Sequence, residues 1–201
     1  MALICSVAIC SALGISAPIP RSLQEDYYPT AVGSKWVYDV QFEDDNFEIS
    51  RSIKSQVAMG ACKAIVIDET IIFDSRPITL TVAEIQVCQH GIFELERKGG
   101  HKFDPPLCML KLPVVKNTKW PWEFGDRWKL AGESGQRTIV EIEEEIEVPA
   151  GKYKTVKVEW SGKVGGEVRS AAYWYAKGTG EVMMKSDKYT RKLKKFIIGE
   201  K

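Results

Sequence analysis

The sequence predicts a mainly β protein: a single large, curved antiparallel sheet or open β-barrel of about ten strands, with little helix. Apolar residues recur at every second position in segments rich in β-branched and aromatic side chains, which is typical of strands. Glycine, proline, asparagine and aspartate separate these segments, as turns between antiparallel strands require. In the mature chain, apolar residues at helical spacing do not persist beyond about two turns, so no helix of ordinary length is predicted there.

The composition limits the size of the fold and the class of partner. The chain has 201 residues, 44% of them hydrophobic, which is enough for one domain with its own core. The formal net charge of +1 gives no electrostatic basis for binding nucleic acid or an anionic membrane surface. We therefore expect no nucleic-acid partner.

The N-terminal segment indicates export. Residues 1–20 carry no charged side chain and are mostly apolar, which is typical of a secretory signal peptide and too short for a membrane span. We expect residues 1–20 to be a signal peptide, 21–26 a linker and 27–201 a single curved antiparallel β-sheet domain. The expected location is periplasmic or extracellular, with no membrane span in the mature chain.

The domain begins as a meander of strands. In the first strand one face is aromatic and apolar: Trp36, Tyr38 and Val40. Four further strands are predicted from alternation and turn residues: near Phe47–Ala58, Cys62–Glu69, Ile78–Cys88 and Ile92–Arg97.

The alternation breaks between residues 99 and 128. The segment Phe103–Pro113 is strongly apolar, but its prolines exclude a central strand because proline has no N–H to donate. We expect this segment to cross over the sheet and cap its open face. A dense aromatic cluster follows: Trp120, Trp122, Phe124 and Trp128. These rings either plug one end of the sheet or form an aromatic pocket or docking patch, and both interpretations stay open.

Alternation returns from Val140 to Val148, where the even positions are largely apolar and the odd positions are glutamates. A turn at 149–151 leads into a strand whose apolar face is Val156, Val158 and Trp160. Pairing of the two strands as a hairpin would set the glutamates beside two lysines: Lys152 and Lys157. The chain then continues through a strand and a glycine turn to Val182. We interpret the basic segment Lys185–Lys195 as an edge strand protected by its charges, in preference to a functional basic patch.

Three cysteines follow the predicted signal peptide: Cys62, Cys88 and Cys108. An odd number allows at most one intramolecular bridge. In an oxidising compartment Cys62 and Cys88 could bridge neighbouring strands, whereas the alternative is that all three are small buried apolar side chains. Their spacing matches neither a zinc site nor a redox Cys-x-x-Cys.

Three motifs occur in order: the entry Tyr28–Tyr38, the turn Val148–Tyr153 and the closing Trp174–Gly180. Together they resemble a broad group of exported bacterial proteins of unknown function, and Ala17–Arg21 resembles planctomycete exported proteins. The resemblance covers almost the whole mature chain. It implies a curved antiparallel sheet similar to Lol-type lipoprotein carriers and brings no catalytic residues. The chain departs from such carriers in lacking predicted helices for the concave face.

No pattern for catalysis or metal binding is recognisable. His90 and His101 fall in predicted loops without Cys, Asp or Glu at ligand spacing. The sequence has no Gly-x-Ser-x-Gly elbow or phosphate-binding glycine loop, and the glutamate row of 141–147 lacks the looped geometry that wraps calcium. We therefore expect no enzyme activity, no cofactor and no metal.

These observations favour an exported, non-enzymatic domain that binds an apolar small molecule or an envelope protein in the concave face of its sheet. The predicted ligand-binding residues are Trp120, Trp122, Phe124 and Trp128, with Leu107, Met109 and Leu112 as a lid. The alternative is a purely structural or interaction protein of the cell envelope with a filled core, and an unrecognised enzyme is the least favoured. A cavity of some hundreds of cubic ångströms would distinguish the first from the second.

Overall fold

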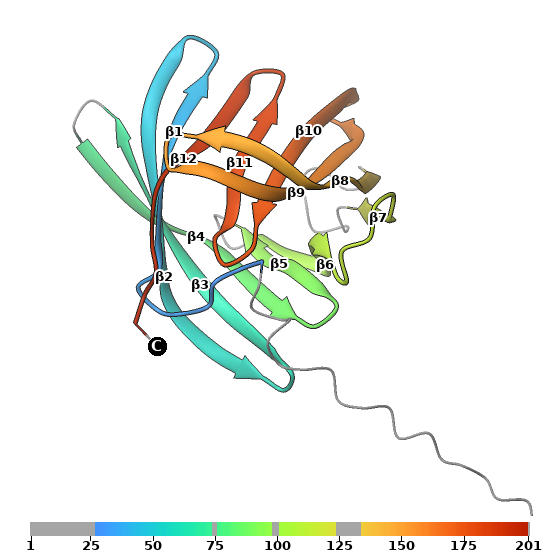
Figure 1. The fold of residues 1–201 in the computed structure, drawn as a ribbon, viewed down its shortest axis with the longest axis horizontal. Helices are drawn as coiled ribbons and strands as arrows, with labels where there is room; N and C mark the ends of the chain where they lie inside the picture. Colours follow the sequence, from blue (N-terminus) through green and yellow to red (C-terminus); the bar gives the residue numbers. More distant parts are fainter. Residues whose placement is uncertain (1–26, 74–75, 98–100, 124–133, 201) are drawn as a thin grey trace, which may run out of the picture.

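The computed structural model describes residues 27–73, 76–97, 101–123 and 134–200, and within these ranges it contains strands and turns but no helix (Figure 1). The predicted signal peptide and linker lie outside the described residues. Because the described part contains no helix, no membrane-spanning helix is found there. The strands are β1 (Lys35–Phe42), β2 (Asp45–Met59), β3 (Cys62–Phe73), β4 (Arg76–Cys88), β5 (Gly91–Arg97), β6 (His101–Lys111), β7 (Lys119–Glu123), β8 (Ser134–Val148), β9 (Gly151–Val164), β10 (Glu167–Ala176), β11 (Gly180–Ser186) and β12 (Tyr189–Ile197).

All twelve strands belong to one antiparallel sheet of order β6-β5-β4-β3-β2-β1-β12-β11-β10-β9-β8-β7. The sheet consists of two six-stranded meanders, β1–β6 and β7–β12, which are joined by pairing of β1 with β12. It curls until the edge strands β6 and β7 approach each other, so that the barrel is nearly closed (Figure 1). The predicted fold class is confirmed, and the expected number of strands is close.

Side chains bridge the gap between β6 and β7, where the sheet has no backbone ladder. The indole Nε1 of Trp120 donates to the carbonyl oxygen of Cys108 at 3.0 Å. Nη1 of Arg137, on β8, lies 3.5 Å from the carbonyl oxygen of Met109. The Cys108 carbonyl oxygen on β6 is therefore satisfied by a side chain from the opposite edge strand, while Arg137 makes only a long contact with the Met109 carbonyl oxygen.

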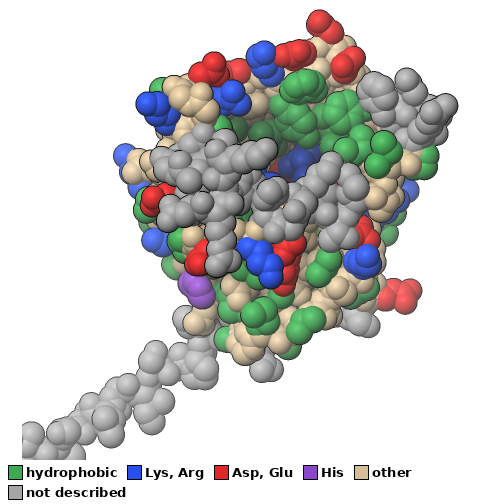
Figure 2. All heavy atoms as spheres, turned by 180° about the vertical axis from the view of Figure 1, so that it is seen from behind, with side chains coloured by type: hydrophobic (Ala, Val, Ile, Leu, Met, Phe, Trp, Pro, Cys, Tyr) green, Lys and Arg blue, Asp and Glu red, His purple; other side chains and the backbone are tan. Residues whose placement is uncertain are grey.

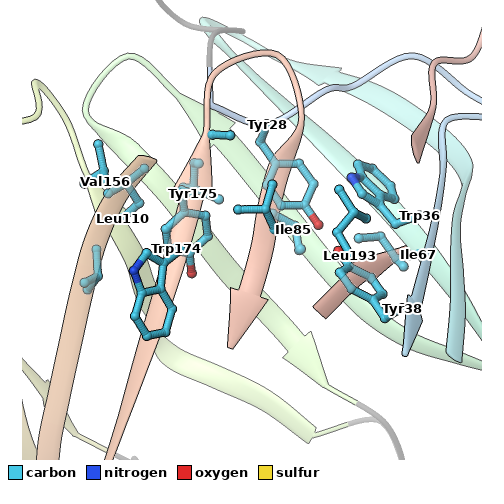
Figure 3. Close-up of a cluster of buried hydrophobic side chains, with 14 of the residues drawn as sticks. Tyr28, Trp36, Tyr38, Ile67, Ile85, Leu110, Val156, Trp174, Tyr175 and Leu193 are labelled. Atoms are coloured by element: carbon cyan, nitrogen blue, oxygen red, sulfur yellow. The ribbon is translucent and has the colours of Figure 1, made fainter. Parts of the chain in front are cut away.

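The inward faces of both meanders form the main core. Figure 3 shows labelled side chains from both halves converging on it, among them Ile67 and Ile85 from one meander and Tyr175 and Leu193 from the other. The predicted face of the first strand is correct, since Trp36, Tyr38 and Val40 are each only 2% exposed. Burial of apolar side chains along both meanders is what holds the curled sheet together.

The entry and closing motifs meet at the β1–β12 junction. The Trp36 indole donates to the carbonyl oxygen of Thr179 at 2.6 Å, and the Tyr38 hydroxyl donates to that of Glu181 at 2.9 Å. The Tyr28 ring packs against Trp36 with centroids 5.6 Å apart. Gly180 has a φ of 89°, which favours glycine, and a Cβ there would touch Tyr28. These residues of the entry and closing motifs therefore have a structural role in joining the two meanders.

The turn motif, Val148–Tyr153, lies across one end of the barrel. In the turn between β8 and β9, the Ala150 N–H donates to the carbonyl oxygen of Leu193 on β12 at 3.0 Å, so this hairpin folds across the end of the sheet (Figure 1). Its bend comes from a bulge in β8, where the register shifts between Ile139 and Glu144 and Glu143 has a φ of 62°. The largely apolar face predicted for Val140–Val148 is therefore interrupted at the bulge, where Ile142 is 42% exposed.

The predicted contacts of the glutamate row with lysines are present. Glu141 lies opposite Lys157 in the β8–β9 register, and Glu147 forms a 4.0 Å ion pair with Lys152. The glutamates at 141, 143, 145 and 147 are exposed, as a solvated strand face requires.

Two segments differ from their predicted positions. The proline-containing segment does not cross over the sheet but forms most of β6, an edge strand, where a missing N–H is tolerated. The basic segment predicted as an edge strand contributes β12, which pairs with both β1 and β11. Its lysines alternate with inward residues such as Leu193, and Lys194 pairs outside with Asp39 and Glu48 at 3.1 and 3.0 Å. The charged side chains of this central strand therefore lie on its outer face, in contact with solvent.

The cysteine alternatives are resolved by a bridge between Cys62 and Cys88. The two residues face each other at the start of β3 and the end of β4, with Cα atoms 4.5 Å apart. Cys108 has a free, partly buried thiol.

Candidate functional site

The sheet encloses a cavity of about 800 Å³ that opens to solvent at one end of the barrel. Its wall includes Leu107, Trp122, Arg137, Trp160, Val164 and Tyr173. Figure 2 shows the hollowed face, where hydrophobic side chains gather at one edge of the hollow and Lys or Arg atoms lie within it. A second cavity of about 320 Å³ lies further inside and shares Arg97, Arg137 and Tyr173 with the first. The interior is thus partly filled by the core and partly open.

The predicted binding residues do not all reach this space. Trp122 and Leu107 line the larger cavity and Met109 lines the deeper one. Trp120 is buried in the main core, and Leu112 packs against that core. Phe124 and Trp128 lie outside the described residues. Leu107 and Met109 belong to the wall strand β6, so the predicted lid is wrong in its placement.

Two glycines hold Trp122 flat against the inner wall. Gly135 on β8 pairs with Gly162 on β9, and Trp122 on β7 lies opposite Gly135 in register. A Cβ at either glycine would overlap the Trp122 ring. Trp160 packs edge-on against Trp122, with ring centroids 5.3 Å apart at an interplanar angle of 86°. The two indoles therefore form a fixed aromatic wall beside the opening.

We expect Gly162→Ala to lower the free energy of unfolding by about 1–3 kcal/mol, because the new methyl group overpacks this wall. The added Cβ would also overlap the Ser134 carbonyl oxygen, which cannot move without disturbing β8. Urea unfolding followed by circular dichroism measures the change. Lys163→Ala, on the exposed neighbouring residue, is the control and should change stability by less than about 0.5 kcal/mol. Equal effects from both substitutions would contradict the packing argument.

The deeper cavity is lined by an unusual set of charges. Four arginines and three glutamates face it: Arg51, Arg97, Arg137, Arg191, Glu69, Glu94 and Glu181. Six of these form three pairs. Arg51 Nε lies 2.7 Å from Glu69 Oε2, Arg191 Nη2 lies 2.6 Å from Glu181 Oε1, and Arg97 Nε lies 2.8 Å from Glu94 Oε1. Arg137 is left over.

The paired arginines keep their charges. Burial is the largest influence on the pKa of Arg191 and lowers it, but Glu181, Tyr189 and Tyr38 together hold that pKa well above its ordinary value. The pKa of Arg51 is also raised: burial and Arg191 lower it, while Glu69, Glu181 and Tyr38 are among the groups that raise it. Burial, reinforced by Glu181, raises the pKa of Tyr38 well above the usual value, so its hydroxyl stays protonated. The interior is consequently ionic in its deeper part and aromatic nearer the opening.

Arg137 is 6% exposed and has no carboxylate partner among the described residues. Its Nη1 makes only the long contact with the Met109 carbonyl oxygen, and its Nε has no hydrogen-bond partner. The guanidinium carbon lies 5.3 Å from the centroid of the Tyr173 ring. A guanidinium is always charged, so the protein buries one positive charge here without a counter-charge from the described residues.

Sequence reasoning missed these arginines and glutamates, although a signal was present. Arg51 stands between Ile49 and Ile53 at the same alternate spacing, and Arg191 stands two residues before Leu193. Each therefore occupies an inward position of its strand.

Other reactive side chains do not form a site in the described part of the chain. His90 is exposed in the turn between β4 and β5. Burial raises the pKa of the Cys108 thiol to about 11, so this cysteine is not an activated nucleophile. No group of three or more His, Cys, Asp or Glu residues that could hold a metal ion occurs within the described ranges.

Comparison with known proteins shows relatedness in fold. No family model matches the sequence, and no curated protein matches it. A crystal structure from Bacteroides fragilis, of a protein inferred to be exported and having a YmcC-like fold, superposes with a TM-score of 0.56 at 10% identity. A protein from Parabacteroides distasonis inferred to be a lipoprotein superposes with a TM-score of 0.56 at 14% identity. Both matches cover 86% of this chain and 99% of the other chain.

At these identities the comparison shows the fold alone. The chain thus resembles in fold two proteins that are inferred to be exported or a lipoprotein, whereas the planctomycete and Lol-type resemblances remain predictions.

Proposed function

We propose that this chain is an exported, non-enzymatic β-domain that binds an apolar molecule inside its barrel. The observation that carries the proposal is the cavity of about 800 Å³ beside the aromatic wall of Trp122 and Trp160. Its volume lies within the range of roughly 300–1,000 Å³ that is common for small-molecule sites. A core packed solid throughout would instead favour the purely structural alternative.

Export is supported by three independent features. The segment 1–20 has the composition of a signal peptide, the disulfide suits an oxidising compartment, and both structural neighbours are inferred to be exported or a lipoprotein. The non-enzymatic part of the proposal rests on the interior, where all three glutamates that line the deeper cavity are engaged in pairs with arginines.

The test is native mass spectrometry of the protein purified from its own envelope fraction, followed by extraction of bound molecules. We expect a stoichiometric apolar molecule, which is lost in Trp122→Leu because that substitution removes half of the aromatic wall. Trp174→Leu is the matched control: Trp174 is 7% exposed, like Trp122, but it lines neither cavity. Circular dichroism verifies that both variants are folded.

A wild-type protein that carries no molecule and binds none of a panel of apolar probes would overturn the proposal. In that case the structural alternative would account for the fold. Equal loss of the bound molecule in both variants would also contradict a site at the aromatic wall.

A further inference from the structure

Arg137 lies where the two cavities adjoin, because it lines both of them. In the sheet it stands directly opposite Trp160 on β9 and next to Trp120 on β7. The aromatic wall and the unpaired guanidinium are therefore neighbours on one inner surface. A molecule lying along Trp160 would have one end within reach of Arg137.

The charged side chains that line the deeper cavity leave one positive charge without a counter-charge. Four arginines but only three glutamates line the deeper cavity, so one positive charge is in excess. The three glutamates are engaged with Arg51, Arg97 and Arg191. Breaking one of these pairs to serve Arg137 would leave another guanidinium without its partner. The missing charge is best supplied from outside the described residues.

The charged side chains that line the two cavities limit the charge that a ligand's head group can carry there. The lining of the larger cavity also includes three carboxylates, which are exposed: Glu43, Glu167 and Asp187. At its inner end, where Arg137 is buried beside Arg97, a cation would be repelled. A neutral molecule would leave the buried guanidinium of Arg137 uncompensated. A carboxylate or phosphate could accept hydrogen bonds from its Nε and Nη atoms, in the bidentate geometry that arginine favours.

We infer that the ligand is an amphiphile with a single anionic head group, carboxylate or phosphate, which pairs with Arg137 while its apolar part lies against Trp122 and Trp160. This inference rests on the proposed function and specifies its ligand class. The buried Nε of Arg137, which lacks a hydrogen-bond partner, marks the position of the head group.

The test uses four probes that share a decyl or decanoyl chain and differ in their head group: decanoate, decyl phosphate, decanol and decyltrimethylammonium. Each is titrated below its micelle concentration into the full mature protein by isothermal titration calorimetry. We expect the two anionic probes to bind at least about ten-fold more tightly than decanol, since a charge-assisted pair in a desolvated site contributes at least that much. The cationic probe should bind most weakly.

Arg137→Gln should abolish the advantage of the anionic probes and leave decanol binding unchanged. Arg137→Lys keeps the positive charge but loses bidentate geometry, so we expect it to retain part of the advantage. Lys154→Gln is the control, because it removes one positive charge from the outer surface of β9, where Lys154 pairs with Glu143 at 3.6 Å. This control should leave all four affinities unchanged.

The outcomes separate the two proposals. Equal binding of decanoate and decanol to the wild-type protein would overturn the head-group inference and leave the apolar-binding function standing. Absence of binding by all four probes would contradict both. A preference between decanoate and decyl phosphate identifies whether the natural head group is a carboxylate or a phosphate. Because the wild-type comparison needs no variant, the inference stays testable even if Arg137→Gln does not fold.

Discussion

Arg191→Met is expected to lower the free energy of unfolding by about 3–5 kcal/mol, because it leaves the Glu181 carboxylate charged and buried without its partner. The side chains of Arg191 and Glu181 are only 9% and 5% exposed. Glu181 Oε1 accepts hydrogen bonds from both Nε and Nη2 of Arg191, at 3.0 and 2.6 Å. Urea unfolding monitored by circular dichroism gives the change.

A matched control is available on the same strand. Lys194→Met removes two outward ion pairs, with Asp39 and Glu48, of a side chain that is 48% exposed, and we expect a loss of less than about 1 kcal/mol. The double variant Arg191→Met with Glu181→Leu should recover much of the stability, since replacing both members of a buried pair by apolar groups is often close to neutral. If Arg191→Met and Lys194→Met lowered the free energy of unfolding equally, the larger contribution expected of the buried pair would be contradicted.

Removal of the disulfide by Cys62→Ser with Cys88→Ser is expected to cost about 3–4 kcal/mol of unfolding free energy. The two cysteines are 26 residues apart, and a bridge of that span reduces the entropy of the unfolded chain by roughly this amount. The bridge pins the end of the β3–β4 pair at residues that face each other across the two strands. Comparison of oxidised wild-type protein and the double variant by urea unfolding measures the loss.

Cys108→Ser is the control for this experiment. Cys108 is a free thiol on β6 and is not part of a bridge. Adding a reducing agent should destabilise the wild-type protein and Cys108→Ser alike, while leaving the Cys62→Ser, Cys88→Ser variant unchanged. Resistance of the wild-type protein to reduction, without any loss of stability in the double variant, would show that the bridge contributes little.

Local patterns predicted the fold class well because strand alternation and turn residues are local properties. Trp36, Tyr38 and Val40 lie on the inner face as predicted, and the hairpin after Val148 forms at the predicted turn. The order of the strands in the sheet, by contrast, is not a local property of the sequence. A basic strand at the centre of the sheet and one at its edge have the same alternation, so Lys185–Lys195 was misplaced. Only the pairing of β12 with distant β1 distinguishes the two.

Ligand binding by the predicted residues stays a prediction. The structure places Trp122 and Leu107 in the cavity wall and Trp120 in the main core. Arg137 escaped notice because a single arginine in a strand is usually solvated, and its burial depends on how β8 lies against β6. The structural contacts of Gly135 and Gly162 with Trp122 likewise depend on three strands coming into register.

The junction of β1 with β12 has a consequence for how the chain reaches its native state. Each six-stranded meander consists of hairpins between consecutive strands, which can form from local contacts alone. The Trp36 indole and the Thr179 carbonyl, which join the meanders, are 143 residues apart in the sequence. Closing so long a loop costs entropy before any contact at the junction repays it, so this step should be late and slow. We therefore expect the two halves to form first and the barrel interior to form only when the last strand docks on the first.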